Sequence, residues 1–232
     1  MKKSIAILLA ALSMIIISCR SSEDTAPENP AVENFFNLNV GNKFVYKTYD
    51  NPDFTNPQSV YIFTGRTDSV SIVGKVEVQG FTFAKERTKT FWTNSTMNNQ
   101  ESFRYLRVNS KGHLVALKTL DNIPITETSG SVIHPGTDFS FTFKRDQIEM
   151  NQLVGSLFYQ LHKDKSIDVE GNVYLVSPYL GDFTPAASQP NLLKKTQEIS
   201  FKKGVGLVKE ICHSVYGKGF FETRLVSATV VN

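Results

Sequence analysis

Cysteine and histidine are scarce in this sequence, which limits the chemistry it can perform. Its 232 residues contain two cysteines, Cys19 and Cys212, and four histidines. Two cysteines cannot form the disulfide framework that holds small secreted domains together. The histidines lack the paired spacing typical of zinc ligands, so a metal site would have to be assembled from distant residues. They are His113, His134, His162 and His213.

Recognisable catalytic motifs are missing as well. The chain has no phosphate-binding glycine loop, no Gly-x-Ser-x-Gly elbow and no zincin motif. Two sets of acidic residues are open to interpretation as acid-base pairs: Asp164 with Asp168 and Glu170, and Glu198 with Glu210. Surface carboxylates are common, however, and we expect no catalytic residue, no metal, no cofactor and no enzymatic activity.

An excess of charge of one sign is also absent. Lysine and arginine total 25, aspartate and glutamate total 22, and the formal net charge is +3. Nucleic-acid-binding domains concentrate basic residues in a patch or stripe. The basic residues of this chain are not clustered in that way, so we expect no nucleic-acid partner.

One long apolar run is present, and it lies near the N-terminus. Lys2 and Lys3 precede a mainly apolar run at residues 5–17, which ends at Ser18 and Cys19. A membrane-spanning helix needs roughly 20 apolar residues. The run is shorter than that, which favours a cleaved export signal over a permanent transmembrane anchor.

The end of this run, Ile16-Ile17-Ser18-Cys19, resembles a bacterial lipobox. In lipoproteins a signal peptidase cuts just before the cysteine, which then carries acyl chains. The resemblance implies that Cys19 is lipidated and attaches the protein to a lipid bilayer, and more than one acyl chain gives stable attachment. The alternative is a plain secretory signal followed by an incidental cysteine.

These observations divide the chain into a signal peptide at residues 1–18, a flexible tether at 19–31 and a single β-rich domain at 32–232. Without the signal, 214 residues with a formal charge of +1 remain, which suits one domain. Enteric lipoproteins kept in the inner membrane carry an aspartate after the cysteine. With Arg20 at that position, the resemblance to lipoproteins implies delivery to the outer membrane. Glu23 and Asp24 are similar to surface-export signals, so the periplasmic and cell-surface faces both stay open.

The body has the pattern of an all-β protein. Short segments of alternating apolar and polar residues are separated by glycine and asparagine turns, and 17 Phe and 8 Tyr supply aromatic core residues. We expect about ten mostly antiparallel strands in a single curved sandwich or incomplete barrel, with a minor helix.

Both ends of the body resemble β-rich Bacteroidota lipoproteins of uncharacterised function. At the start, Phe35 and Phe36 precede a Leu-x-Val-Gly-Asn turn at residues 38–42, and near the end residues 204–209 read Gly-Val-Gly-Leu-Val-Lys. Neither motif carries chemistry, because the glycines permit turns and the apolar residues pack. Phe35 and Phe36 either plug one end of the core or form the rim of a ligand pocket.

Three segments give sharper expectations. The buried face changes parity between Val78 and Phe81, which predicts a β-bulge at Gly80. Alternation over residues 139–143 predicts a half-buried strand. Prolines and glycines interrupt residues 177–197, which predicts a long loop that gates a ligand site.

Cys212 is expected to be a small core residue. It has no partner for an intramolecular disulfide once Cys19 is lipidated, and it lies in a strand-like run at residues 207–212. His213 is adjacent, but consecutive side chains of a strand point to opposite faces. A catalytic Cys-His pair is therefore disfavoured.

Our leading hypothesis is a membrane-tethered, non-enzymatic binding or accessory module of the cell envelope. Its ligand would be apolar or amphipathic, or its partner an envelope protein; lipoproteins that carry lipidated cargo use a similar half-barrel. A ligand requires a cavity of at least ~300 Å³, expected between the sheet and the loop around Phe183. The alternatives are a structural or interaction lipoprotein with an exposed apolar patch, and an envelope hydrolase with converging titratable side chains.

Overall fold

Thirteen antiparallel strands form the body in the computed structural model, which describes residues 35–93, 98–121, 123–214 and 216–231. The fold is all-β, as the sequence predicted, with more strands than expected. The strands are β1 Lys43–Asn51, β2 Ile62–Val78, β3 Phe81–Trp92, β4 Gln100–Val108, β5 Leu114–Leu117, β6 Ser131–His134, β7 Thr142–Glu149, β8 Gln152–Leu161, β9 Lys165–Val169, β10 Asn172–Pro185, β11 Lys195–Lys202, β12 Gly206–His213 and β13 Phe220–Thr229.

The described ranges contain no helix, so the minor helix expected from the sequence does not occur there. It follows that none of the described residues belongs to a helix long and apolar enough to cross a membrane. The predicted signal peptide, the lipidation site Cys19 and the predicted tether all lie outside the described residues.

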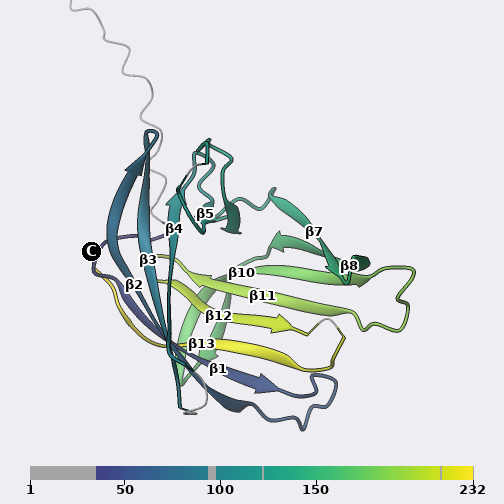
Figure 1. Ribbon diagram of the computed structural model, residues 1–232. Helices are drawn as coiled ribbons and strands as arrows, with labels where there is room; N and C mark the ends of the chain where they lie inside the picture. The colour runs from purple at the N-terminus through teal and green to yellow at the C-terminus, as the bar shows by residue number, and fades with distance from the viewer. Residues whose placement is uncertain (1–34, 94–97, 122, 215, 232) are drawn as a thin grey trace, which may run out of the picture. The chain divides into compact units, whose positions relative to one another are not determined.

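The strands form one sheet in the order β6-β5-β4-β3-β2-β1-β13-β12-β11-β10-β8-β7, with β9 paired to β10 (Figure 1). The first and last strands of the chain, β1 and β13, pair with each other at the middle of the sheet. The two edge strands, β6 and β7, follow each other in sequence. No pairing joins β6 to β7 among the described residues, so the sheet is curved but not closed.

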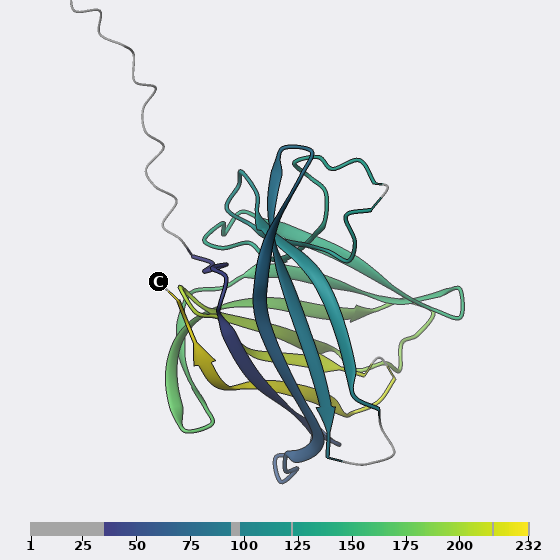
Figure 2. The same cartoon turned by 60° about the vertical axis from the view of Figure 1, so that its left-hand side comes forward.

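The long neighbouring strands β2 and β3 form a twisted hairpin within the sheet (Figure 2). They are joined by Gln79 and Gly80, whose φ angles of 51° and 81° are those of a two-residue turn that matches strand twist. The expected β-bulge at Gly80 was therefore wrong. The parity change arises because Val78 and Phe81 are paired across a hairpin turn.

The bulge in this hairpin lies instead at Val73 in β2, where the register shifts between Ile72 and Gly74. Further register shifts occur between Val45 and Tyr46 in β1 and between Ser200 and Phe201 in β11. A bulge bends its strand and increases the local twist. These irregularities give the sheet the curvature that a concave face requires.

Two sequence expectations about loops and strands were wrong. Residues 177–197 are mostly strand, because β10 continues to Pro185 and β11 begins at Lys195. The half-buried strand expected at residues 139–143 begins only at Thr142, and Phe139 and Phe143 are both exposed.

The start of the body is fixed against its end. Asn42 is fully buried, its side chain donates to the backbone carbonyl of Asn37, and its Oδ1 accepts the backbone N–H of Val231 at 2.7 Å. Gly41 next to it has the positive φ expected for this turn. Phe35 and Phe36 are both buried against the core, and Phe36 also lines the cavity described below.

Candidate functional site

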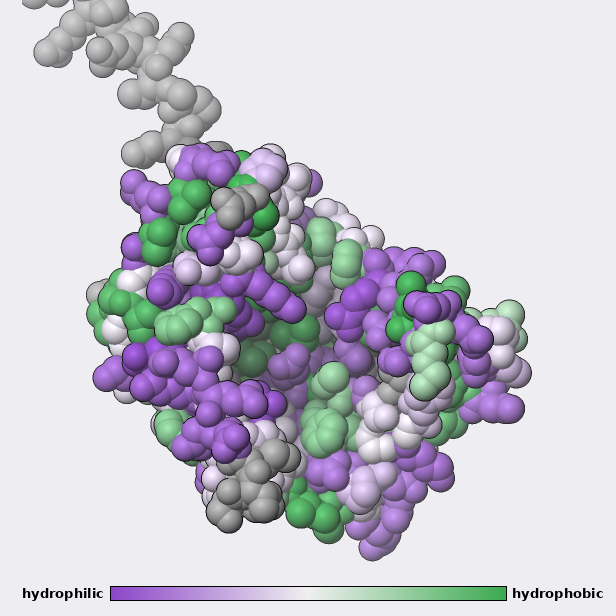
Figure 3. Space-filling model, in the orientation of Figure 1, coloured by the Kyte–Doolittle hydropathy of each residue, from purple (hydrophilic) through white to green (hydrophobic). Residues whose placement is uncertain are grey.

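A cavity of about 960 Å³ occupies the concave face of the sheet. Its walls come from β1, β2, β3 and β4 on one side and from β12 and β13 on the other. Figure 3 shows this face hollowed near its centre, with hydrophobic side chains at the floor and hydrophilic ones around it. A cavity exists, as the ligand hypothesis required. Its expected location was wrong, since Phe183 is buried in a separate core cluster.

The cavity changes character along its strands. At one end it is apolar, where Phe44, Val70, Ile72 and Leu106 are all buried. Alternating residues of a strand share one face, so each strand that contributes an apolar residue here contributes its next inward residue to a second level. That second level carries most of the cavity's charge.

Ion pairs hold this charged level together. Arg66 binds Asp68 through two contacts, of 3.2 and 2.9 Å, and Thr90 Oγ1 donates to the same carboxylate at 2.5 Å. Arg104 on β4 forms a close ion pair with Glu86 on β3. Both acidic residues are buried, so each arginine neutralises a carboxylate that would be costly to bury alone.

Tyr46 on β1 crosses the charged level. Its hydroxyl donates to the backbone carbonyl of Leu207 on β12 at 3.0 Å. Burial, followed by the negative charge of Glu86, raises the pKa of Tyr46 above its ordinary value. The phenol is therefore neutral and serves as a hydrogen-bond donor within the wall.

Glu210 on β12 differs from the other charged residues of this level because its side chain has no partner in the described ranges. Its side chain lines the cavity, yet it makes no hydrogen bond or ion pair with any residue that the structure describes. Burial raises its pKa, and the positive charges of Arg104 and Arg66 act in the opposite direction. A carboxylate without a direct partner is therefore available to a molecule in the cavity.

The other end of the cavity opens to solvent between aromatic side chains. Phe103 and Phe221 line it and are about half exposed, and Trp92 also lines the cavity. Cys212 also lines this end and is exposed, so its expected place in the core was wrong. Although the residue is exposed, the surrounding cavity wall desolvates its thiol and, together with the charge of Glu210, raises the pKa of the thiol, which opposes activation as a nucleophile.

The other acidic candidates have separate partners. Glu198 binds Lys165 at 3.0 Å and Lys209 at 3.6 Å, and it does not share the cavity with Glu210. Glu170 binds Arg224, Asp164 accepts from Ser177, and Asp168 accepts the backbone N–H of Gly171. The structure therefore does not present these carboxylates as acid-base pairs.

The histidines have separate surroundings as well. His113 contacts Asp138 and His134 contacts the carbonyl of Ser177, whereas His162 contacts Gln160 and His213 packs on Phe54. Within the described ranges no group of three or more His, Cys, Asp or Glu side chains could hold a metal ion.

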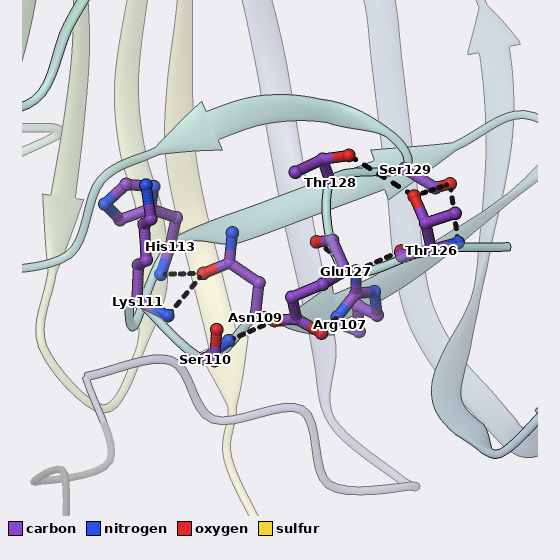
Figure 4. A network of polar contacts seen from close by, with 9 residues as sticks. All are labelled: Arg107, Asn109, Ser110, Lys111, His113, Thr126, Glu127, Thr128 and Ser129. Atoms are coloured by element: carbon purple, nitrogen blue, oxygen red, sulfur yellow. Dashed lines mark hydrogen bonds and ion pairs between the residues drawn. The ribbon is translucent and has the colours of Figure 1, made fainter.

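A second polar network surrounds Arg107 near one edge of the sheet (Figure 4). The guanidinium is buried, donates to the backbone carbonyls of Thr126 and Glu127, and binds the Glu127 carboxylate at 3.2 Å. It also lies over the ring of Phe81 at 4.7 Å. Because its contacts are to the protein itself, this network fixes the loop between β5 and β6.

Exposed apolar side chains gather at the turn between β7 and β8. Ile148 is 64% exposed, Met150 97% and Leu153 46%. They form a hairpin tip rather than a pocket, because Met150 and Asn151 are the positive-φ turn residues. This tip keeps the structural or interaction alternative open.

Sequence reasoning did not identify the charged level of the cavity. One signal was present, since Arg66 and Asp68 have the same strand parity as the core residues Val70 and Ile72. Charged residues in phase with a buried face indicate a polar interior site. The partners Glu86, Arg104 and Glu210 come from three other strands, and no sequence spacing relates them.

Comparisons with known proteins do not assign a family to this chain. No protein-family model matches it and no curated protein matches it. One similar solved structure, from Bacteroides fragilis NCTC 9343, is of a protein taken to be exported and described as having a YmcC-like fold; its TM-score is 0.47 and its identity 6%, over 85% of this chain and 99% of that chain.

A second, from Parabacteroides distasonis ATCC 8503, is of a protein taken to be a lipoprotein. Its TM-score is 0.42 and its identity 9%, over 85% of this chain and 99% of that chain. Similarities at these levels establish neither a shared family nor a function.

Proposed function

We propose that this protein is a lipid-anchored, non-enzymatic binding protein of the bacterial cell envelope that holds an amphipathic small molecule. The observation that carries the proposal is the cavity of about 960 Å³ on the concave face, apolar at one end and charged in the middle. Ligand sites are typically concave, largely apolar and furnished with a few placed polar groups. The cavity has all of these features.

The geometry of the cavity favours an amphiphile over a purely polar ligand. Its closed end is formed by buried aliphatic and aromatic side chains, such as Ile72 and Leu106, which offer no hydrogen-bonding group. Burying an alkyl chain against such a wall yields about 25 cal/mol per Å² of apolar surface. The charged level then receives the polar end of the same molecule.

The lipid anchor rests on the sequence alone, and we propose an outer-membrane location on the same basis. In the Cys19→Ala variant, acylation has no site, so the protein should no longer be held in the membrane as a mature lipoprotein. Metabolic labelling with a radioactive fatty acid should lose its signal entirely. Labelling that persists in the variant would contradict the proposal that Cys19 is the acylated residue.

Filling the cavity should weaken ligand binding. Thr88 lines the cavity and makes no side-chain hydrogen bond with the described residues, so Thr88→Phe places a ring there without removing a polar contact. The ring occupies volume that the ligand needs, and a loss of about 1.4 kcal/mol of binding free energy weakens binding roughly 10-fold. The measurement is a titration of the full chain with 1-decanol, followed by the fluorescence of Trp92, the single tryptophan.

The matched control is Thr82→Phe in the same strand. Thr82 is exposed and does not line the cavity, so this variant makes the same chemical change away from the site. Its binding curve should coincide with that of the wild type. If Thr88→Phe binds decanol as tightly as Thr82→Phe does, the cavity is not the binding site.

A further inference from the structure

We propose that the ligand of this cavity carries a cationic amine, and that Glu210 on β12 is the residue that binds it. This inference rests on the proposed function, because it names the chemistry of the polar end of the ligand. The feature that supports it is an unpaired carboxylate among groups that are already paired. The argument therefore begins with the partners of each charged side chain.

The two arginines near Glu210 are occupied by other carboxylates. Arg66 makes two contacts with Asp68, and Arg104 pairs with Glu86. Asp68 also accepts a hydrogen bond from Thr90. Burial raises the pKa of Glu210 and the positive charges of both arginines act to lower it, but neither arginine lies within ion-pair distance of its carboxylate.

The charges of this level do not cancel. With every group ionised, the two ion pairs are neutral and Glu210 leaves one negative charge. Lys118 also lines the cavity, but it is exposed, follows the end of β5, and is not among the charges that act on Glu210. A single cation placed beside Glu210 would balance the level.

An ammonium group meets the chemical requirements of this position. Glu210 is partly buried and lines the cavity without a direct partner among the described residues, and a hydrogen bond between two charged groups is roughly twice as strong as a neutral one. An anionic head group would have to displace Asp68 or Glu86 from its arginine and would then lie close to Glu210. The site therefore selects an amine over a carboxylate.

Three amphiphiles that share a ten-carbon chain test this selectivity: decylamine, 1-decanol and decanoate. The full-length lipid-anchored protein is placed in phosphatidylcholine vesicles, and binding is measured as protection of Cys212 from alkylation by N-ethylmaleimide. Cys212 is suited to this because it is exposed and lines the same cavity. Decylamine should protect at a concentration at least about 10-fold below that of decanol, and decanoate should be the weakest.

The Glu210→Gln variant should lose this preference. It should weaken protection by decylamine about 10-fold while leaving decanol unchanged, because glutamine keeps the shape but not the charge. Glu77→Gln is the control: Glu77 is exposed, lies outside the cavity, and its replacement changes the net charge equally. It should leave all three amphiphiles unaffected.

Several results would overturn the inference. If the wild type binds decanoate or decanol more tightly than decylamine, the inference is wrong, whether or not Glu210→Gln folds. If a folded Glu210→Gln protein binds decylamine as tightly as the wild type, the inference is also wrong. Decanol binding in the cavity without an amine preference would leave the proposed function standing, whereas no protection by any of the three would refute both.

Discussion

Replacing Arg107 with leucine is expected to lower the free energy of unfolding by about 3 kcal/mol. Its guanidinium is only 5% exposed and bonds two backbone carbonyls and a carboxylate of residues 126 and 127. Leucine keeps the apolar stem but leaves these acceptors without their donor and removes the cation from the ring of Phe81. For a domain of this size the melting temperature should fall by roughly 6 to 12 °C.

Thermal unfolding followed by circular dichroism measures this effect, and Arg87→Leu provides the control. Arg87 reaches Glu101 at only 3.8 Å with both side chains more than a third exposed. Such surface pairs contribute less than about 1 kcal/mol. Equal melting temperatures for the two variants would show that the Arg107 network does not hold the loop between β5 and β6.

Local alternation was a good guide to the fold where a strand has one buried face. β1 alternates between buried and less buried positions through Phe44, Tyr46 and Thr48, the pattern that predicts a half-buried strand. β9 and β10 form a hairpin whose turn residues Glu170 and Gly171 both have positive φ angles, as glycine-containing turns between strands often do. The all-β class followed from many such segments.

Proline and glycine misled the prediction for residues 177–197. Gly181 is not a turn residue; it lies in β10, where a Cβ atom would collide with the ring of Tyr159 on the neighbouring strand. Pro178 also lies within β10, and its carbonyl accepts the backbone N–H of His162 at 2.8 Å. Such residues are allowed in a strand where close packing or an interruption of pairing requires them, and sequence alone does not distinguish that case from a loop.

The candidate site was harder to predict than the fold, because its parts come from different strands. Glu210 was noted only as a possible partner of Glu198, and the two residues have different surroundings. What makes Glu210 distinctive is the pairing of Arg66 and Arg104 with other carboxylates. That property depends on the order of strands in the sheet, which alternation within one strand does not determine.

Acidification should weaken the contact that His134 makes between the edge strand β6 and strand β10. This side chain on β6 is fully buried between aromatic rings, its Nε2 lies 2.9 Å from the carbonyl of Ser177 on β10, and its Nδ1 accepts the backbone N–H of Gly136. Burial lowers the pKa of His134 to about 4, although the Ser177 carbonyl and the charge of Asp164 act in the opposite direction. The neutral ring fits this arrangement, since a protonated Nδ1 could not accept from Gly136.

The sign of the effect follows from the two pKa values. The unfolded chain binds a proton near pH 6.5 and the folded chain only near pH 4, so the stability due to neutral His134 is complete above pH 6.5 and is lost as the pH falls toward 4. The loss amounts to about 3 kcal/mol. Denaturant unfolding at several pH values between 4 and 7.5 measures it.

The variant His134→Phe separates this effect from the other groups that titrate in the same range. Burial and Lys195 also lower the pKa of His213, so the wild type and the variant share that contribution and their difference isolates His134. At pH 7.5 the variant should be less stable by about 1 to 2 kcal/mol, because two hydrogen bonds are lost. At pH 4 the wild type has lost more than that, so the two stability curves should cross. Parallel curves would mean that neutral His134 does not hold β6 against β10.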